Sequence, residues 1–428
     1  MPRNDWRVQP LAPDYVVVDF SEDPERIFSY SPWVMLCPGG RLVATVGRAA
    51  AFGAHLDGEV HETGSGDWHR YWQGRVYTSD DNGRSWTLRT SFPFMHARAF
   101  LAGERLYVLG QAGDLMIMAS DDHGETWSPP VKLTEGQTWG QAPCAIWYRD
   151  GRVYISMTRR TSFEIKGWGL AEGAPVLMRG NVDADLTDVG HWTFASELSF
   201  RDLVDDATLD AHGIPFFDAF FPEDRDLAPG RHCPPVGWLE SNVVQFTDPD
   251  HVWCDPTGRT FHLWSRAHTG LTNYAAIVKV VENDDGTMTT LPERAPSGRR
   301  CVFVPCPGGH MKFHIIRDDA TGLFWLLSSQ ATDSMCRIDR LSEDRFALPD
   351  NERRRLQLHF STNCVDWCFA GLVAVGPVER ASRHYASMVI VGEDLHILSR
   401  SGDERARSAH DGNLITFHTV RNFRDLVY

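Results

Sequence analysis

Hydrophobic and polar positions alternate in short runs along most of the chain, and turn residues separate the runs. Six segments each contain an apolar strand pattern, a turn rich in Gly, Asp or Pro, and a second apolar strand pattern. This arrangement predicts β-hairpins, and no long run with a helical period competes with it. The six segments are residues 34–47, 99–111, 145–157, 251–266, 314–329 and 388–400.

Two eight-residue segments repeat almost identically and begin 41 residues apart, Ser79–Trp86 and Ser120–Trp127. Both follow the pattern S-x-D-x-G-x-[ST]-W, the Asp box, in which Asp and Gly stabilise a tight turn and Trp packs beneath it. A shorter, degenerate copy spans Ser361–Trp367. The spacing is typical of one four-stranded blade of a β-propeller. We therefore predict an all-β, six-bladed β-propeller as a single domain over residues 1–428, with five blades as the alternative.

Two segments add detail to this prediction. The strand pattern of residues 13–20 (PDYVVVDF) is expected to complete the last blade, which closes the ring and removes an exposed edge. Residues 200–236 break the alternation and are expected to form a long insertion over one face.

The charge of the chain excludes several classes of function. Asp and Glu number 57 and Lys and Arg 42, so the formal net charge is −15. A surface this acidic repels phosphate backbones, so we expect no nucleic-acid partner. No window approaches the ~20 apolar residues of a membrane helix, and the N-terminal residues carry no apolar signal core. The expectation is a cytoplasmic protein without a membrane partner, whose oligomeric state the sequence leaves open.

The nine cysteines are scattered and form no CxxC pair, so we expect reduced structural thiols. No HxH or HExxH spacing is present either. The sequence therefore predicts neither a metal site nor a cofactor.

With its Asp boxes, the chain resembles the sialidase superfamily of Asp-box propellers. In one blade of those enzymes a Glu precedes an apolar strand, a turn and an Arg, and Glu240 and Arg266 fit this order. A Tyr followed by small residues and a hairpin marks the last blade, and Tyr385 fits it. The first blade usually opens with an Arg eight residues before a Pro-x-Gly turn, but Tyr30 occupies that position before Pro38. This departure implies a divergent member that does not act on sialic acid itself.

The resemblance implies a catalytic set. Sialidases attack the substrate with a Tyr in place of the usual carboxylate, which implies Tyr385 as nucleophile and Glu240 as its base. The acid/base Asp is expected in the loop 48–74, and Asp67 is closest to the family spacing. The alternatives are a half-buried strand tyrosine, a solvent-facing Glu and a solvated loop. Other candidates in that loop are Asp57, Glu59, Glu62, His55, His61 and His69.

Sialidases hold the substrate carboxylate with three Arg, because the guanidinium fork fits a carboxylate. Arg266 corresponds to the second of these, and the segment that matches the third offers His310 and Lys312 instead. The other candidates for substrate contact are Arg48, Arg383, His384 and Arg400, with Arg400, His410 and Asp411 on one rim loop. The alternative is that these cations pair with neighbouring Asp and Glu and serve only the scaffold.

Three functions remain open. The leading hypothesis is an exo-acting glycoside hydrolase that removes a terminal acidic or deoxy sugar, with an anionic carbohydrate as its only partner. The second is a polysaccharide lyase that uses His and Tyr on the same fold, and the third is a non-catalytic propeller that binds glycans or proteins. Under the leading hypothesis, removing Arg266 or Lys312 weakens an acidic ligand and leaves folding nearly intact.

Overall fold

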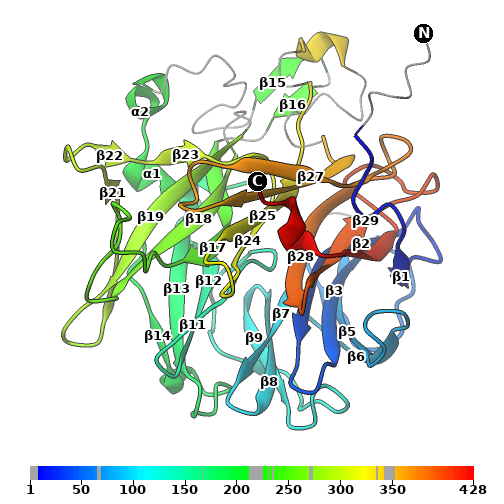
Figure 1. The fold of residues 1–428 in the computed structure, drawn as a ribbon. Coiled ribbons are helices and arrows are strands. Elements are labelled where there is room, and N and C mark those ends of the chain that lie inside the picture. Colours follow the sequence, from blue (N-terminus) through cyan, green and yellow to red (C-terminus); the bar gives the residue numbers. More distant parts are fainter. Residues whose placement is uncertain are drawn as a thin grey trace.

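The computed structural model describes residues 8–64, 69–166, 168–211, 225–229, 231–233, 236–268, 273–333, 336–341 and 352–428. These residues form six antiparallel sheets of at least four strands, which follow one another around a common centre in chain order (Figure 1). The predicted six-bladed β-propeller is confirmed, and the five-bladed alternative is wrong.

The first three blades contain the strands β2 to β14. From the centre outward, the first blade consists of β2 (Ile27–Leu36), β3 (Leu42–Ala50), β5 (Tyr71–Ser79) and β6 (Thr87–Phe92), with β4 (His61–Glu62) also paired to β5. The second consists of β7 (Met95–Ala102), β8 (Arg105–Ala112), β9 (Asp114–Ser120) and β10 (Val131–Lys132). The third consists of β11 (Trp147–Arg149), β12 (Arg152–Arg160), β13 (Gly173–Asn181) and β14 (Trp192–Phe194).

The last three blades complete the ring, and the N-terminal strand takes part in the sixth. The fourth blade consists of β17 (Gly237–Val244), β18 (Thr260–His268), β19 (Tyr274–Glu282) and β20 (Met288–Leu291), with β23 (Phe303–Pro305) also paired to β19. The fifth consists of β24 (His314–Arg317), β25 (Phe324–Ser329), β26 (Arg355–Ser361) and β27 (Cys368–Val375). The sixth consists of β28 (Arg383–Val391), β29 (Asp394–Ser401), β30 (Leu414–Val420) and β1 (Val16–Phe20).

Short elements fill the connections. The described part of the segment 200–236 contains α1 (Phe200–Leu203), α2 (Asp206–Ala211) and a hairpin of β15 (Arg225–Ala228) and β16 (Arg231–Cys233). A second small hairpin pairs β21 (Glu293–Arg294) with β22 (Arg300–Cys301). Single turns of 3₁₀-helix are η2 (Leu170–Glu172), η3 (Val189–His191), η4 (Ile338–Arg340) and η5 (Phe423–Leu426).

The Asp-box segments form the turns that their sequence predicts. Asp81 accepts hydrogen bonds from the hydroxyl groups of Ser79 and Ser85, at 2.8 and 2.6 Å. These bonds lower the pKa of Asp81 to about 2, with the Ser85 hydroxyl as the main cause. The indole N–H of Trp86 donates to the Gly83 carbonyl at 3.2 Å. The Ser120–Trp127 segment repeats these contacts.

Apolar side chains fill the space between every pair of neighbouring blades. One cluster joins the first and second blades through residues such as Val43 and Val108, and four more continue around the ring. The cluster between the sixth and first blades includes Val18 of β1 together with Val34 and Ile415. Because each blade packs against two neighbours, its innermost strand is held rigidly at the axis.

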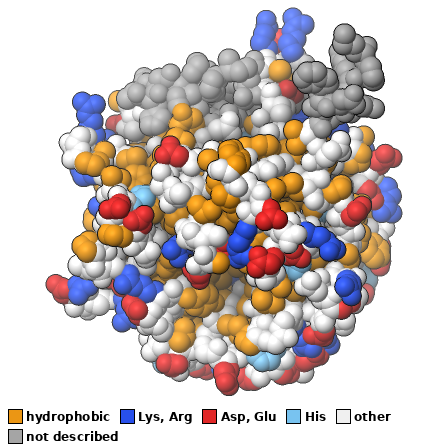
Figure 2. All heavy atoms as spheres, viewed as in Figure 1, with side chains coloured by type: hydrophobic (Ala, Val, Ile, Leu, Met, Phe, Trp, Pro, Cys, Tyr) orange, Lys and Arg blue, Asp and Glu red, His pale blue; other side chains and the backbone are white. Residues whose placement is uncertain are grey.

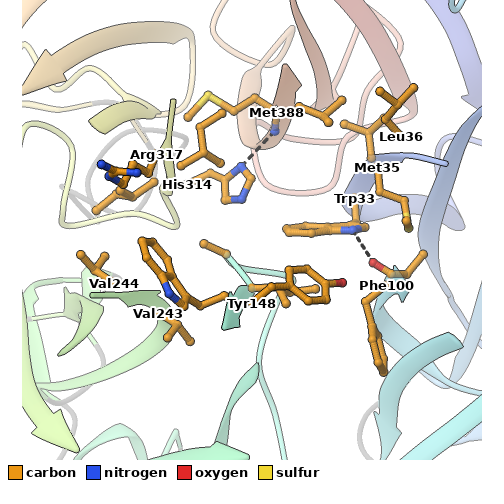
Figure 3. A pocket seen from close by; sticks show the side chains of 18 of the residues that line it. Trp33, Met35, Leu36, Phe100, Tyr148, Val243, Val244, His314, Arg317 and Met388 are labelled. Carbon is orange, nitrogen blue, oxygen red and sulfur yellow. Dashed lines mark hydrogen bonds between the residues drawn. The ribbon is translucent and has the colours of Figure 1, made fainter. Parts of the chain in front are cut away.

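A cavity of about 450 Å³ opens on the face shown in Figures 1 to 3, and we call it the apolar cavity. Hydrophobic side chains lie in several patches near the centre of this face, between acidic and basic ones (Figure 2). The residues that line the cavity come from several blades (Figure 3). They include Trp33, Phe100, Tyr148, Val243, Val244, His314 and Met388.

Other features limit the chemistry of the described parts of the chain. Eight of the nine cysteines have side chains that the structure describes, and all eight are free. No group of three His, Cys, Asp or Glu side chains is arranged to bind a metal within the ranges given above. None of the helices described is both long and apolar enough to cross a bilayer.

Candidate active site

A second cavity, of about 360 Å³, lies where the innermost strands begin, and we call it the polar cavity. Strand β2 contributes Tyr30 and Ser31 to it and, further along, Trp33 to Leu36 to the apolar cavity, so the two cavities lie at opposite ends of the axis. Its polar lining consists of Tyr30, Ser31, His69, His96, Gln111, Gln141, Glu240, Arg266, Arg353, Tyr385, Arg400 and His410. Its indole lining consists of Trp72, Trp139 and Trp168.

Three residues implied by the resemblance meet in the polar cavity. An Nη1 hydrogen of Arg266 is donated to the Tyr385 hydroxyl oxygen at 2.6 Å, and the same nitrogen lies 3.5 Å from Oε2 of Glu240. Because both distances share that nitrogen, 2.6 Å plus 3.5 Å is the upper limit for the separation of the two oxygen atoms. This is within the reach of proton transfer through one water molecule.

The backbone explains how the Glu and the Tyr reach the cavity. Glu240 and Tyr385 have positive φ angles of 61° and 49°, each at a register shift of its innermost strand. Ser31 and His96 show the same combination in the first two blades. A β-bulge re-aims a side chain, and a left-handed non-Gly residue costs about 1–3 kcal/mol of strain. In four blades, therefore, a β-bulge with a left-handed residue directs a side chain toward the polar cavity.

Burial and neighbouring charges shift the pKa of the Tyr385 hydroxyl. Burial raises the pKa of Tyr385 above its ordinary value, an effect that Arg266 opposes and Glu240 reinforces. The phenol is therefore neutral at physiological pH. The Arg266 hydrogen bond to its oxygen stabilises any negative charge that forms when the phenol proton leaves.

Two further guanidinium groups line the cavity beside the tyrosine ring. The guanidinium carbon of Arg400 lies 3.6 Å from the centre of the Tyr30 ring and 5.4 Å from that of Tyr385. Arg400 also donates to the His410 carbonyl. The guanidinium carbon of Arg353 lies 5.3 Å from the Tyr385 ring centre. With Arg266, these residues place three positive charges around Tyr385, and the only carboxylate among the described lining residues is Glu240.

Tyr30 stands where the resemblance led us to expect an Arg, and it belongs to a polar cluster. Its hydroxyl donates to Oδ1 of Asp411 at 2.7 Å and lies 3.0 Å from Nε2 of His69 and 3.2 Å from Nδ1 of His410. The Nδ1 atom of His410 lies 2.8 Å from the same Asp411 oxygen. The first blade and the rim loop 402–413 thus meet in this cluster.

Arg48 and Arg383 do not reach the polar cavity, which corrects their assignment to substrate contact. Arg48 forms a two-pronged ion pair with Asp19 of β1, at 2.7 and 3.0 Å, and so ties the first blade to the closing strand. Arg383 donates to the carbonyls of Ser382 and Gly402, at 2.7 and 2.8 Å. The scaffold alternative applies to both residues.

His310, Lys312 and His384 lie behind the cavity wall, so direct substrate contact was also wrong for them. His310 contributes its backbone carbonyl, which accepts a hydrogen bond from Nε of Arg266 at 2.7 Å. Lys312 is fully buried and donates to the carbonyl of Ala386. The Nδ1 atom of His384 lies 3.0 Å from Nη1 of Arg353. These residues support the wall from behind.

Asp67 lies outside the described residues, so its role stays a prediction. Among the Arg and Glu residues that line the cavity, Arg353 is the one that sequence reasoning missed. It is one of three consecutive Arg residues, 353–355, and no local pattern distinguishes the one that reaches the axis. The histidine of the loop 48–74 that does reach the cavity is His69, whereas His55 is exposed and paired with Asp57.

Comparisons with known proteins agree with this architecture. No protein-family model and no curated protein sequence matches the chain. A solved protein of unknown function from Dyadobacter fermentans is similar over 96% of this chain and 98% of its own, with a TM-score of 0.54 and 13% identity. The chain has the sialidase-like β-propeller fold.

Two similar solved structures are glycoside hydrolases. A Trypanosoma rangeli sialidase in complex with sialic acid matches 98% of this chain and 60% of its own length, with a TM-score of 0.53 and 13% identity. A Penicillium chrysogenum α-L-arabinanase complexed with arabinobiose matches 97% of this chain and all of its own, with a TM-score of 0.50 and 11% identity. At these identities the likeness establishes a glycoside hydrolase-like fold and leaves the activity to the site.

Proposed function

We propose that this protein is an exo-acting glycoside hydrolase that removes a terminal anionic sugar from a glycan. The observation that carries the proposal is the hydrogen-bonded group of Tyr385, Arg266 and Glu240, which two strained bulges aim at one cavity. A non-catalytic glycan-binding propeller has no need of this strain or of a buried carboxylate beside a phenol.

The geometry supports a nucleophilic mechanism. The Tyr385 oxygen attacks the anomeric carbon while its proton passes to Glu240, and Arg266 stabilises the phenolate character of the oxygen. A neutral phenol approaches an anionic sugar with less repulsion than a carboxylate nucleophile would, which suits a cavity with three Arg residues. The volume of about 360 Å³ is near the lower end of ligand pockets and suits a terminal sugar.

The anionic character of the substrate rests on Arg266, Arg353 and Arg400. All three guanidinium groups are at least 97% buried at the residue level, and the only carboxylate among the described lining residues is Glu240. Concentrating like charges is costly unless an anion completes the site. The Trp walls supply flat apolar surfaces against which a sugar ring can pack.

A substrate screen with two readouts tests the proposal. Aryl glycosides of sialic, uronic, deoxy and neutral sugars are assayed for aryl alcohol release, and uronate polysaccharides for unsaturated products that absorb in the near ultraviolet. We expect release from an acidic glycoside that the Tyr385→Phe variant abolishes. Unsaturated products would establish the lyase alternative, and tight glycan binding without turnover would establish a binding protein; either result overturns the proposal.

A further inference from the structure

The cluster around Asp411 contains a histidine whose free nitrogen can be assigned. The carboxylate of Asp411 accepts from the Tyr30 hydroxyl and lies 2.8 Å from Nδ1 of His410. Burial alone would raise the pKa of Asp411, but the hydrogen bonds from His410 and His69 hold it well below its usual range. Because an ionised carboxylate can only accept, Nδ1 of His410 carries a proton directed at Asp411.

The other ring nitrogen of His410 is then available to a ligand. Burial and the neighbouring Arg400 lower the pKa of His410 to about 4, so the ring is neutral at pH 7 and Nε2 holds a lone pair. The His410 side chain is 41% exposed and lines the polar cavity, whereas Asp411 behind it is only 14% exposed. An Asp-oriented imidazole of this kind is a common arrangement for proton transfer.

The position of His410 relative to Tyr385 allows the two side chains to contact opposite sides of a bound sugar. Arg400 lies between the two walls, with its guanidinium carbon 3.6 Å from the Tyr30 ring centre and 5.4 Å from the Tyr385 ring centre. Tyr30 contacts His410, and Tyr385 contacts Arg266. A sugar placed over Arg400 therefore has the nucleophile on one side and the histidine on the other.

We propose that His410, oriented by Asp411, is the proton-transfer residue of this site, and the proposal rests on the proposed hydrolase function. In the first step the Tyr385 oxygen bonds to the anomeric carbon, the glycosidic bond breaks, and protonated His410 gives its Nε2 proton to the leaving oxygen. The Tyr385 proton passes to Glu240. In the second step a water oxygen bonds to the anomeric carbon, its proton goes to His410, and Tyr385 departs with the proton held by Glu240.

Binding of an anionic substrate favours protonation of His410 by the solvent, and this is the proton that the first step needs. The charged and titratable groups near His410 are Arg400, Arg353, Asp411, His69, Tyr30, His384 and Arg407. An anionic sugar over Arg400 and Arg353 offsets the two positive charges that disfavour the imidazolium. His410 therefore takes up a proton when an anionic substrate binds, and Asp411 stabilises that charge. Tyr30 and His69 are positioning residues, since they act by holding Asp411 and the ring.

The leaving group of the substrate provides the test. An acidic sugar is offered as a dinitrophenyl glycoside, whose leaving group needs no proton, and as a methyl glycoside, whose leaving group does. We expect His410→Gln to lower kcat/KM about 10²–10⁴-fold on the methyl glycoside and far less on the dinitrophenyl glycoside, on which kcat falls instead because the second step lacks its base. Azide should restore turnover of the dinitrophenyl glycoside by the variant, with a glycosyl azide as product.

Matched variants separate the possible outcomes. His55→Gln makes the same chemical change at an exposed site and should match the wild type. Asp411→Asn should reproduce the leaving-group dependence of His410→Gln in kcat/KM, whereas a purely structural role would lower kcat/KM equally on both substrates. Equal losses by His410→Gln on both substrates, or the expected pattern in Asp67→Asn alone, overturn this inference and leave the hydrolase proposal standing. A wild type that cleaves neither substrate overturns both.

Discussion

The two ends of the propeller axis are built by the same strands and have opposite chemistry. Five of the six innermost segments give their earlier residues to the polar cavity and their later residues to the apolar cavity, and β24 of the fifth blade lines the apolar cavity alone. On β17 the change from Glu240 to Val243 and Val244 takes three residues. The other pairs, polar end first, are Tyr30 and Trp33 on β2, His96 and Ala99 on β7, Gly140 and Ala145 before β11, and Tyr385 and Met388 on β28.

The backbone differs between the ends in the same way as the side chains. Ser31, His96, Glu240 and Tyr385 have positive φ angles at the polar end, whereas no described residue that lines the apolar cavity has one. Strain in non-Gly residues persists only where the surroundings impose it, and it gathers at functional sites. Strain, and not cavity size, therefore distinguishes the polar end, because the apolar cavity is the larger of the two.

The largest expected effect comes from removing one oxygen atom at the polar end. Tyr385→Phe eliminates the proposed nucleophile, so we expect kcat on an aryl glycoside to fall about 10³-fold or more in a protein that still folds. The matched control is Tyr148→Phe in the wall of the apolar cavity, which should keep full activity. An active Tyr385→Phe enzyme would remove the functional distinction between the ends.

The second prediction concerns stability and replaces an expectation from sequence. Arg266 is 1% exposed and faces the buried carboxylate of Glu240, so Arg266→Ala leaves that charge without its partner. We expect a loss of about 3–5 kcal/mol in the free energy of unfolding, measured by urea denaturation. Arg317→Ala at the rim of the apolar cavity, which breaks an exposed pair with Asp319, should cost less than about 1 kcal/mol. Equal losses would mean that the polar end is no more interdependent than the surface.

The third prediction concerns Lys312. In the sequence it lies between His310, whose carbonyl accepts a hydrogen bond from Arg266, and His314, which lines the apolar cavity. Burial lowers the pKa of Lys312 from 10.5 to about 8, although Cys144 and Glu240 oppose the shift. Between pH 8 and 10.5 the unfolded chain therefore binds more protons than the folded chain. The contribution of Lys312 to stability rises with pH across this window and is lost as the pH falls through 8.

Lys312→Met measures this contribution. Relative to the variant, the wild type should gain up to about 3 kcal/mol in unfolding free energy between pH 7.5 and 10.5. Urea denaturation of both proteins at several pH values provides the measurement. Lys132→Met, at an exposed side chain, is the control and should show no such gain. A pH-independent difference for Lys312→Met would show that the ammonium is not desolvated at this position.

Local pattern determined how much of this molecule the sequence could predict. Alternation and turn residues predicted five of the six hairpins correctly, because both are properties of neighbouring residues. The hairpin expected at residues 251–266 was wrong, because residues 251–259 form no strand and β18 pairs with β17 across a longer connection. Glu240, Arg266 and Tyr385 were selected by resemblance to family motifs, which are local patterns: a Glu before a strand, a turn and an Arg, and a Tyr before a hairpin. Arg48 was misassigned because its partner, Asp19, lies on another strand and only the closed ring brings them together.

Other parts of the site depend on contacts that no local pattern contains. In the sequence, Tyr30 was noted only because it stands where an Arg was expected. In the structure its ring lies against Arg400, and its hydroxyl donates a hydrogen bond to Asp411, 381 residues away along the chain. Arg353 is brought to the axis by the geometry of the fifth blade. Such contacts depend on how blades are arranged around the ring, so they require the three-dimensional structure.

The smallest expected effect tests the strain itself. Ser31 lines the polar cavity with a φ of 41°, a conformation that glycine adopts without penalty. Ser31→Gly should therefore leave the free energy of unfolding unchanged or raise it, by no more than about 1 kcal/mol. Ala99→Gly, at a buried position of the apolar end with ordinary backbone geometry, should lower it by about 0.5–1 kcal/mol. Thermal melts of the two variants give the sign directly, and a destabilised Ser31→Gly would show that the bulges at the polar end are relaxed, so that strain no longer separates the two ends.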